Sequence, residues 1–314
     1  MSQLKIGVVG YGNWGKNHVR VLSELDHLGG VYDEYYNIEN STENIKFYNS
    51  LEELINNVDG LIISSPANTH FEIAKKALEK IDVLIEKPIA MKTSDVINLQ
   101  ELEQKYENLI LVGHQLHFHP AIIKMEALIN GGEIGNLKWI YSNRLNMGKI
   151  RPNENVLWSF APHDLSLIFK FINSDVINLS VQASKILNNK IEDTTLSLLD
   201  FENGQKAHVF VSWIHPFKEQ RFVVVGDKGS IVFSDSKKIN KLELYKTTVQ
   251  EDGVISSHDL EQIKYVEKEP LKEQAMYFID CIKSRKVPIN NSAHALKVTK
   301  ILEESSNIIN KRGR

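Results

Sequence analysis

A glycine-rich loop near the N-terminus constrains the fold of this chain more than any other feature. Residues 4–9 form an apolar run, Gly10-Tyr11-Gly12-Asn13-Trp14-Gly15 follows it directly, and helical spacing begins at 13–25. This order of strand, G-x-G-x-x-G loop and helix is typical of a dinucleotide-binding unit. Gly10, Gly12, Asn13, Trp14 and Gly15 are therefore expected to form part of the cofactor site, with the pyrophosphate at the N-terminus of the helix. Trp14 flanks the pyrophosphate or the nicotinamide, or is an exposed loop aromatic.

An acidic residue follows the loop at the distance that such a unit requires. Asp33 lies 18 residues after Gly15, at the end of a second expected strand at 30–32. An acid in this position binds the ribose hydroxyls of NAD. No arginine or lysine occurs in the Glu34-Tyr35-Tyr36-Asn37 segment to bind a 2′-phosphate, so the sequence favours NAD over NADP. Glu34 is the alternative ribose ligand, and a solvated turn carboxylate is the alternative role of Asp33.

The hydrophobic pattern of the chain changes near residue 120. Before this point short apolar runs alternate with helical stretches, which predicts a doubly wound parallel sheet. After a helix at 121–130 the chain consists mostly of alternating or β-branched runs joined by turn signals, with two helical stretches at the end. These runs predict an open, mostly antiparallel sheet. We therefore expect an α/β protein with a Rossmann domain at 1–120 and a second α/β domain at 121–314.

Composition excludes several classes of protein. The 314 residues are 42% apolar and 25% charged, as in soluble globular proteins. Lys and Arg (37) nearly balance Asp and Glu (40), so there is no basic field for nucleic acid. The single cysteine, Cys281, excludes an intrachain disulfide and a cysteine-rich zinc site. No apolar run approaches the roughly 18 residues of a membrane span. With an N-terminus that enters a strand at once, we expect a cytoplasmic protein without nucleic-acid or membrane partners.

Two further motifs carry a family resemblance. Ser64-Ser65-Pro66-Ala67-Asn68-Thr69-His70 and Glu86-Lys87-Pro88 follow expected strands at 61–63 and 83–85. With the glycine loop, Val225-Gly226-Asp227-Lys228-Gly229-Ser230 and residues 270–284, they resemble the Gfo/Idh/MocA family of oxidoreductases over almost the whole chain. The Glu-Lys-Pro triplet is the most specific part. The resemblance implies NAD as cofactor, bound additionally by Ser64, Ser65, Pro66, Asn68, His70, Glu86, Lys87 and Gln115.

The resemblance gives Lys87 a catalytic and a substrate-binding role. In the family, the lysine of this triplet lies between the nicotinamide and the substrate. An ammonium there stabilises an alkoxide that develops on the reacting carbon, or exchanges a proton with it. A role as base requires a lowered pKa, whereas charge stabilisation does not. The resemblance also implies a cis peptide bond before Pro88.

A second catalytic position falls in Ser159-Phe160-Ala161-Pro162-His163-Asp164. The family often has D-x-x-x-H on a helix here, and this chain keeps the histidine but has Ser159 in place of the acid. Asp164 is adjacent to His163 in sequence and therefore points away from it on a helix. We expect His163 to bind substrate and to act as acid or base, with a structural helix histidine as the alternative.

Two of the seven arginines in the chain, Arg144 and Arg151, lie in residues 143–151, shortly before Trp158 and His163. Arginine binds phosphate and carboxylate groups through paired hydrogen bonds. We expect at least one of the two to contact the substrate; in the alternative, one pairs with an acid and the other is solvated. This stretch and residues 158–164 resemble family members that oxidise nucleotide-linked amino sugars at C3, which implies that Trp158 also lines the substrate site.

A histidine-rich segment follows the last strand of the first domain. His114, His117 and His119 invite a metal site, but no carboxylate is spaced with them, and family members that resemble this chain need no metal. We therefore expect no metal. His117 and His119 are candidate substrate contacts, with packing as the alternative for at least one of them. His18, one turn into the first helix, is interpreted as an ordinary helix histidine outside the site.

The resulting prediction is an NAD-dependent dehydrogenase that oxidises a secondary hydroxyl of a sugar. The most concrete substrate is a UDP-N-acetylhexosamine or its uronic acid, oxidised at C3. The alternatives are an inositol or free-sugar dehydrogenase, a glycosidase that uses NAD transiently, and a non-catalytic regulator that senses a dinucleotide. The open face of the second sheet, as in the family, is expected to be buried in a homodimer or homotetramer.

Overall fold

A computed structural model of the chain describes residues 3–36, 45–148, 150, 154–187, 190–249 and 255–312. The chain divides into two compact units. The first contains Met1–Gln115 and Glu269–Lys300, and the second contains Leu116–Lys268 and Ile301–Arg314. The first change of unit thus lies close to the expected boundary at residue 120. Residues 269–300, which the sequence pattern assigns to the second domain, pack with the first unit.

The first unit is built on a parallel sheet with the strand order β2-β1-β3-β4-β5. Its strands are β1 (Ile6–Val9), β2 (Leu28–Tyr32), β3 (Gly60–Ile63), β4 (Asp82–Ile85) and β5 (Ile110–Val112). Its helices are α1 (Asn13–Glu24), α2 (Leu51–Ile55), α3 (His70–Ala77), α4 (Thr93–Tyr106) and α7 (Pro270–Ser284), with the 3₁₀ turn η2 (Ala67–Thr69). Strands β1, β3, β4 and β5 are buried along their whole length, as expected of a sheet covered on both faces. The predicted doubly wound sheet is confirmed.

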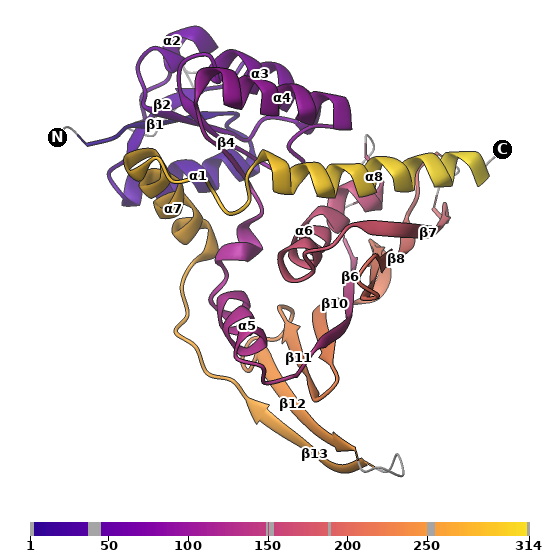
Figure 1. Ribbon diagram of the computed structural model, residues 1–314. Coiled ribbons are helices and arrows are strands. Elements are labelled where there is room, and N and C mark those ends of the chain that lie inside the picture. The colour runs from indigo at the N-terminus through magenta and orange to yellow at the C-terminus, as the bar shows by residue number, and fades with distance from the viewer. Residues whose placement is uncertain are drawn as a thin grey trace. The chain divides into compact units, whose positions relative to one another are not determined.

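Helices cover both faces of this sheet. Apolar residues of α2, α3 and α4 pack with those of β3, β4 and β5 in one continuous core, and α3 lies beside α4 (Figure 1). Helix α1 lies beside α7, and Val21 packs there with Leu271 and Ala275. The segment after α7 also joins this unit, because the main chain of Asn290 accepts a hydrogen bond from the Val112 N–H at 2.9 Å. These contacts explain why residues 269–300 belong to the first unit.

The second unit contains an eight-stranded sheet with the order β13-β12-β11-β10-β6-β9-β8-β7. Among the strands that the structure describes in this sheet, β6 and β9 pair in parallel and all other neighbours pair antiparallel, so the predicted mostly antiparallel sheet is confirmed. The strands are β6 (Leu137–Met147), β7 (Val176–Ser184), β8 (Thr194–Phe201), β9 (Lys206–Ser212), β10 (Ile214–Gly226), β11 (Gly229–Ser234), β12 (Leu242–Val249) and β13 (Ile255–Gln262). The other elements are η3 (Gln115–Phe118), α5 (Pro120–Asn130), α6 (Val156–Phe171) and α8 (Ser292–Arg312), whose first residues belong to the first unit.

The last two strands of the sheet were missing from the sequence prediction. In Figure 1, β12 and β13 run side by side as the long orange hairpin at the sheet edge. Strand β13 has the sequence ISSHDLEQ and lacks an apolar face, so no hydrophobic period indicates it. It is held by its main-chain pairing with β12.

Within the described residues, no helix has both the length and the apolar character that crossing a membrane requires.

Candidate active site

The glycine loop joins the end of β1 to the start of α1. Gly10 has a φ of +91°, which L side chains rarely adopt. A Cβ on Gly15 would lie 1.8 Å from the carbonyl oxygen of Gly10, so any side chain there would overlap the main chain. By contrast, nothing lies within 4 Å of a Cβ placed on Gly12. The loop is therefore closely packed at its first and third glycines and open at its second.

The start of α1 fits an anionic group. Gly12 is the N-cap, no side chain caps the helix, and its first turn contains no acidic residue. The first N–H groups of a helix attract anions, because they lack intrahelical acceptors and lie at the positive end of the helix dipole. Gly12, Asn13 and Trp14 are exposed here. These residues fit the pyrophosphate of a dinucleotide and would hold it.

Asp33 follows β2, and its carboxylate contacts the glycine loop. Oδ2 accepts a hydrogen bond from the Tyr11 N–H at 2.6 Å, and Oδ1 accepts one from the Tyr35 N–H at 2.9 Å. Since β2 is the neighbour of β1, the acid lies beside the loop, where a dinucleotide places its ribose. Asp33 thus has the position expected of a ribose ligand, and Glu34 is exposed.

The loop that follows β3 supports its neighbours through two side chains. Ser64 Oγ donates to the carbonyl oxygens of Val9 and Gly10, each at 3.0 Å. His70 is buried, with Nε2 2.9 Å from the Ser65 oxygen and Nδ1 2.8 Å from the Pro88 oxygen. Burial lowers the pKa of His70. Ser64 and His70 therefore connect the loops after β1, β3 and β4. The other predicted residues of this loop are exposed or half-buried: Ser65, Pro66 and Asn68.

Glu86 and Lys87 leave the carboxyl end of β4. The Lys87–Pro88 peptide bond is cis, as the resemblance implied. Lys87 is half-buried, whereas Glu86 is buried, with its Oε2 accepting the Lys87 N–H at 3.2 Å and its Oε1 2.8 Å from His18 Nε2. Burial opposes ionisation of Glu86, but hydrogen bonds from His18 and Trp14 and the charge of Lys87 hold its pKa below the usual value. A buried carboxylate therefore accompanies the predicted catalytic lysine.

A neutral histidine leaves the neighbouring strand at the same level. Ile85 of β4 pairs with Val112 of β5, so Lys87 and His114 each lie two residues beyond a paired position. His114 is buried, and burial, reinforced by His294 and Lys87, holds its pKa well below 6.5. Gln115 follows it and is half-buried. At neutral pH His114 is therefore an uncharged neighbour of Lys87.

In the second unit, Arg144 of β6 pairs with Asp164 of α6. Asp164 Oδ2 accepts from Arg144 Nε at 2.7 Å, and Oδ1 accepts from Nη2 at 2.9 Å and from Ser142 Oγ at 2.7 Å. Despite burial, which lowers it, the pKa of Arg144 is raised by the charge and hydrogen bonds of Asp164. Asp164 thus faces the sheet. Among the described residues, Nη1 of Arg144 has no hydrogen-bond acceptor, and its contact with substrate stays a proposal.

Helix α6 carries both Trp158 and His163. Asn155 caps the helix by accepting the Trp158 N–H at 3.2 Å, and Trp158 Nε1 donates to Ser306 Oγ on α8 at 2.9 Å. Trp158 is buried, and His163 is half-buried. Ser159, where the family often has an acid, is also buried. Helix α6 therefore carries His163 one residue after Pro162, and its role as acid or base stays a proposal.

The two other histidines of the predicted substrate site have packing partners. His117 Nε2 lies 2.7 Å from Ser166 Oγ, and both residues are buried. His119 caps α5, its Nδ1 accepting the Ala121 N–H at 3.1 Å. Arg151 lies outside the described residues. In the portion of the chain that the structure describes, no group of three or more His, Cys, Asp or Glu side chains is arranged to hold a metal ion.

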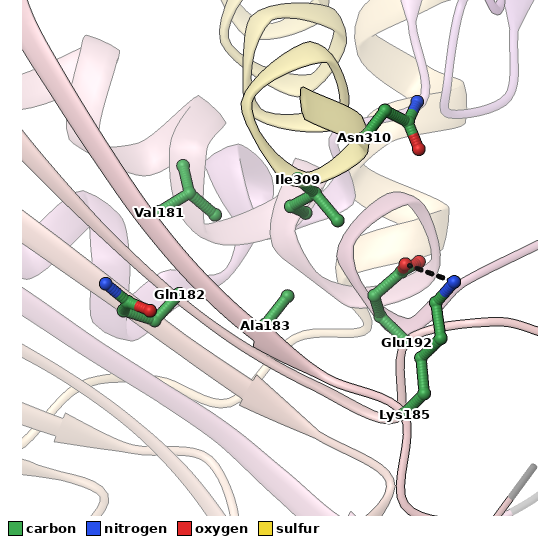
Figure 2. Close-up of a pocket in the computed structure, with 7 residues that line it drawn as sticks. All are labelled: Val181, Gln182, Ala183, Lys185, Glu192, Ile309 and Asn310. Atoms are coloured by element: carbon green, nitrogen blue, oxygen red, sulfur yellow. Dashed lines mark ion pairs between the residues drawn. The ribbon is translucent and has the colours of Figure 1, made fainter. Parts of the chain in front are cut away.

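A pocket of about 450 Å³ lies in the second unit, at the edge strand β7. Figure 2 shows Lys185 and Glu192 paired on one side of it and Ile309 and Asn310 of α8 on the other. Glu192 Oε2 also accepts from Nδ2 of Asn155, the N-cap of α6, at 2.8 Å. None of the predicted site residues is among its described lining residues, and its acid supports the start of α6.

Two family profiles match the chain along both units. The description "Oxidoreductase family, NAD-binding Rossmann fold" matches residues 4–114, and the "GFO/IDH/MocA C-terminal domain" matches residues 122–232. The chain belongs to the Gfo/Idh/MocA family. Its cofactor is NAD, and it is an oxidoreductase, as the names of its relatives in this family indicate.

Individual members of the Gfo/Idh/MocA family resemble the whole chain. UDP-N-acetylglucosamine 3-dehydrogenase of Acidithiobacillus ferrooxidans is 26% identical over 254 residues, 78% of each chain. Inositol 2-dehydrogenase 2 of Saccharopolyspora erythraea is 24% identical over 73% of this chain and 72% of its own. The solved structure of the Acidithiobacillus enzyme has a TM-score of 0.86, 20% identity and 98% coverage of both chains. GenD2 from gentamicin A biosynthesis, solved with NAD, has a TM-score of 0.82, 18% identity and coverage of 100% and 96%. These two structures show the fold.

Sequence reasoning overlooked His18 in this member of the Gfo/Idh/MocA family. We expected an ordinary helix histidine, but it is 1% exposed and contacts Glu86 from α1. Its partner lies 68 residues away, and only the fold brings the two together. The available signal was the spacing of four residues between Trp14 and His18. This spacing places the two side chains on the same face of α1, in the turns that directly follow the glycine loop.

Proposed function

We propose that this cytoplasmic oxidoreductase oxidises a secondary hydroxyl of a sugar, at C3 of a UDP-N-acetylhexosamine or its uronic acid. The similarity to UDP-N-acetylglucosamine 3-dehydrogenase over 78% of the chain supports this substrate class. The resulting reaction converts a secondary alcohol and NAD into a ketone, NADH and a proton. Bound NAD supplies the acceptor for the hydride.

The arrangement at the carboxyl edge of the parallel sheet is the single observation that carries the proposal. The glycine loop after β1, Asp33 after β2 and Lys87 after β4 all leave the sheet at this edge. In open parallel sheets, ligands bind outside the carboxyl ends of the strands. A lysine ammonium at this edge, beside the dinucleotide residues, is suited to stabilise negative charge on the oxygen of an alcohol that is losing hydride.

Two side chains are candidates for the proton of the hydroxyl. His163 is half-buried on α6 and belongs to the residue type whose proton exchange occurs near neutral pH. Lys87 is half-buried directly after the ionised Glu86, and a lysine ammonium can stabilise negative charge on the substrate oxygen without giving up a proton. We therefore assign charge stabilisation to Lys87 and acceptance of the proton to His163.

We propose that Lys87, His117, His163 and Trp158 contact the sugar and that Arg144 and Arg151 bind its anionic part. For Arg144, the support is that two of its nitrogens are fixed by Asp164, which orients the guanidinium without neutralising all of its donors. Asn13, Ser65, Pro66, Asn68 and Gln115 complete the proposed cofactor contacts.

An inositol or free-sugar dehydrogenase is the second candidate. It is favoured by the similarity to inositol 2-dehydrogenase 2, which covers nearly as much of the chain as the nucleotide-sugar enzyme does. The two candidates share the hydride chemistry and differ in whether the substrate carries a diphosphate. Binding of the anionic part by arginine would therefore separate them.

The test is NADH formation from NAD with UDP-amino sugars, UDP-amino sugar uronic acids, free sugars and inositols. A ketone trap, or an aminotransferase with its amino donor, is included because oxidation of an alcohol by NAD is unfavourable near neutral pH. We expect a signal with a UDP-amino sugar that is lost in Lys87→Met, while NAD binding by that variant is retained. A signal with inositols alone would move the assignment to the second candidate. Silence with every substrate while NAD still binds would contradict both.

We also propose that a second copy of the chain covers the open face of the second sheet. One face of this sheet packs against α5 and α6. The other carries partly exposed apolar side chains, with Trp139 37%, Leu198 45% and Leu260 51% exposed. Tyr141 stacks on His208 there, with ring centroids 5.2 Å apart. Exposed apolar side chains gathered on one face of a sheet often mark an interface, and a twofold axis would place this face against itself.

A further inference from the structure

One buried contact connects the helix of the glycine loop to the strand of the catalytic lysine. His18 lies on α1, whose N-terminus is the candidate pyrophosphate site, and Glu86 closes β4 directly before Lys87. The His18 Nε2 and Glu86 Oε1 atoms are 2.8 Å apart, and the two residues are only 1% and 6% exposed. Since Glu86 is ionised, it can only accept, so Nε2 of His18 carries the proton.

The second oxygen of the same carboxylate holds the main chain of Lys87. Oε2 of Glu86 accepts the Lys87 N–H at 3.2 Å. On the opposite side, a Cβ on Gly113 would lie 2.8 Å from the carboxyl carbon and from Oε2. The carboxylate is therefore confined between α1, the end of β5 and the main chain of the lysine. A displacement of Glu86 would move the residue that follows it.

The His18–Glu86 pair is expected to add little net stability to the fold. A buried carboxylate pays a large desolvation penalty, and replacing a buried polar pair by well-packed apolar residues is often neutral or stabilising. The pKa of Glu86 is nevertheless held below its usual value by His18, Trp14 and Lys87. The chain thus maintains a negative charge at one defined place next to Lys87. A fixed charge beside a reacting ammonium changes both its orientation and its affinity for a proton.

We propose that His18 is a positioning residue for Lys87, acting through Glu86. The proposal rests on the function proposed above for Lys87 and adds to it a residue outside the cofactor and substrate contacts. His18 keeps the carboxylate ionised and in place, and the carboxylate fixes the main chain and the charge state of the lysine. Since His18 belongs to α1, the same contact ties the lysine to the helix that binds the pyrophosphate.

Four variants separate positioning from simple stability. His18→Leu removes the donor, and His18→Gln keeps an N–H donor near the position of Nε2. Glu86→Gln keeps the shape of the side chain and removes its charge. Val19→Ala is the matched control. Val19 is the neighbour of His18 on α1 and is 3% exposed, so shortening it creates a cavity while both partners of the His18–Glu86 pair are kept.

The first measurement is the pH dependence of acetylation of Lys87 by a dilute amine-reactive reagent, followed by mass spectrometry of the peptide, with and without NAD. It needs no substrate and therefore remains valid if the proposed function fails. Loss of the negative charge makes an ammonium easier to deprotonate. We expect the midpoint for Lys87 to fall by at least about half a pH unit in Glu86→Gln, which removes the charge. In His18→Leu the carboxylate stays ionised but loses the donor that holds it in place, so the midpoint should move away from the wild-type value. His18→Gln and Val19→Ala should keep the wild-type midpoint. An identical midpoint in all five proteins would overturn the proposal.

The second measurement is turnover with the substrate found in the panel above. We expect kcat to fall by about tenfold or more in His18→Leu, with the Kd for NAD changed less than about threefold, and His18→Gln to recover most of kcat. Val19→Ala should lower the melting temperature while kcat stays within about twofold of wild type. A loss of kcat in Val19→Ala equal to that in His18→Leu would show that stability alone accounts for the effect and would overturn the positioning role.

Discussion

Asp164 holds Arg144 by two nitrogens at once, with Oδ2–Nε and Oδ1–Nη2 distances of 2.7 and 2.9 Å. The Arg144 side chain is 15% exposed and that of Asp164 2% exposed. The pair is thus largely removed from water, and the flat guanidinium is fixed in one plane against the sheet. This pairing limits the anion binding of Arg144, because only the edge of the guanidinium that faces away from Asp164 remains to donate hydrogen bonds to an anion.

Breaking this pair from one side should be costly. We expect Asp164→Leu to lower the free energy of unfolding by about 3 kcal/mol or more, because it leaves a largely buried guanidinium without its partner. The double variant Arg144→Met/Asp164→Leu should recover much of that loss, since both charges are gone. Urea unfolding of the wild type, the two single variants Asp164→Leu and Arg144→Met, and the double variant measures the coupling. Equal losses in the single and double variants would mean that the two side chains contribute independently.

The second and third glycines of the loop should respond differently to alanine. In Gly15→Ala the new Cβ would lie 1.8 Å from the Gly10 oxygen, so we expect a protein that unfolds well below the wild-type temperature. Gly12→Ala meets no atom within 4 Å, and its free energy of unfolding should change by less than about 1 kcal/mol.

The cost of Gly12→Ala should appear in cofactor binding instead, because the methyl group occupies the approach of the pyrophosphate. We expect NAD affinity to fall by at least about tenfold, or about 1.4 kcal/mol, in calorimetric titration. Unchanged NAD affinity in a folded Gly12→Ala protein would contradict the assignment of this loop to the pyrophosphate.

Stability should decline on the acid side of neutrality. Burial lowers the pKa of His70 and, further, that of His114, so each binds a proton more readily in the unfolded chain, where the usual value is 6.5. As the pH falls below about 6.5, the two histidines bind protons in the unfolded chain but remain uncharged in the folded protein. The free energy of unfolding then decreases by up to about 1.4 kcal/mol per pH unit for each histidine. Above this pH their contribution is constant.

Removing one of these histidines should flatten the slope. In urea titrations between pH 5 and 6.5, we expect the free energy of unfolding of His114→Leu to depend less steeply on pH than that of wild type. The decrease in slope should equal about the contribution of one histidine. Leu111→Ala on β5 is the matched control, since it removes buried volume without a titrating group and should lower stability by a similar amount at every pH. A parallel slope in His114→Leu and wild type would show that His114 binds its proton equally well in the folded and unfolded states, against the lowered pKa.

The open sheet face can be tested by charge. Leu198 is 45% exposed on β8, and its side chain lies in the register row of His208 and Tyr141. We expect Leu198→Glu to reduce the mass measured by sedimentation toward that of one chain, because a second copy would bury the carboxylate. Leu187→Glu, at a 54% exposed leucine outside the strands, should leave the mass unchanged. A wild-type chain that sediments as a monomer would rule out the proposed second copy.

The parts of the fold that follow from local pattern could be predicted from the sequence. The glycine loop lies between its strand and helix, and the five apolar runs of the first unit form the parallel sheet, because buried strands need continuous apolar residues. Strand β13 escaped prediction, since an exposed edge strand is defined by main-chain pairing and not by side chains. The residue types near Lys87 were visible, but their pairing was not.

Long-range pairing explains what sequence reasoning left open. His18 and Glu86 are 68 residues apart, and no period or motif connects a histidine on one helix to an acid on a distant strand. For the arginines, the sequence allowed the alternative that one of them pairs with an acid. The structure shows this pair between Arg144 and Asp164. The sequence could not choose among neighbouring acids, because one residue along a helix changes the direction of a side chain by about 100°.

The return of residues 269–300 to the first unit has a consequence for synthesis on the ribosome. Val21 of α1 packs with Leu271 and Ala275, 250 and 254 residues later, and Val112 of β5 bonds to Asn290, 178 residues later. These contacts form only after residues 116–268 of the second unit have been made. Until then the nascent nucleotide-binding unit exposes the apolar face of α1 and one edge of its sheet. This unit is therefore the first to be started and among the last to be finished, and a gene fragment cut at the apparent boundary near residue 120 would encode an incomplete protein.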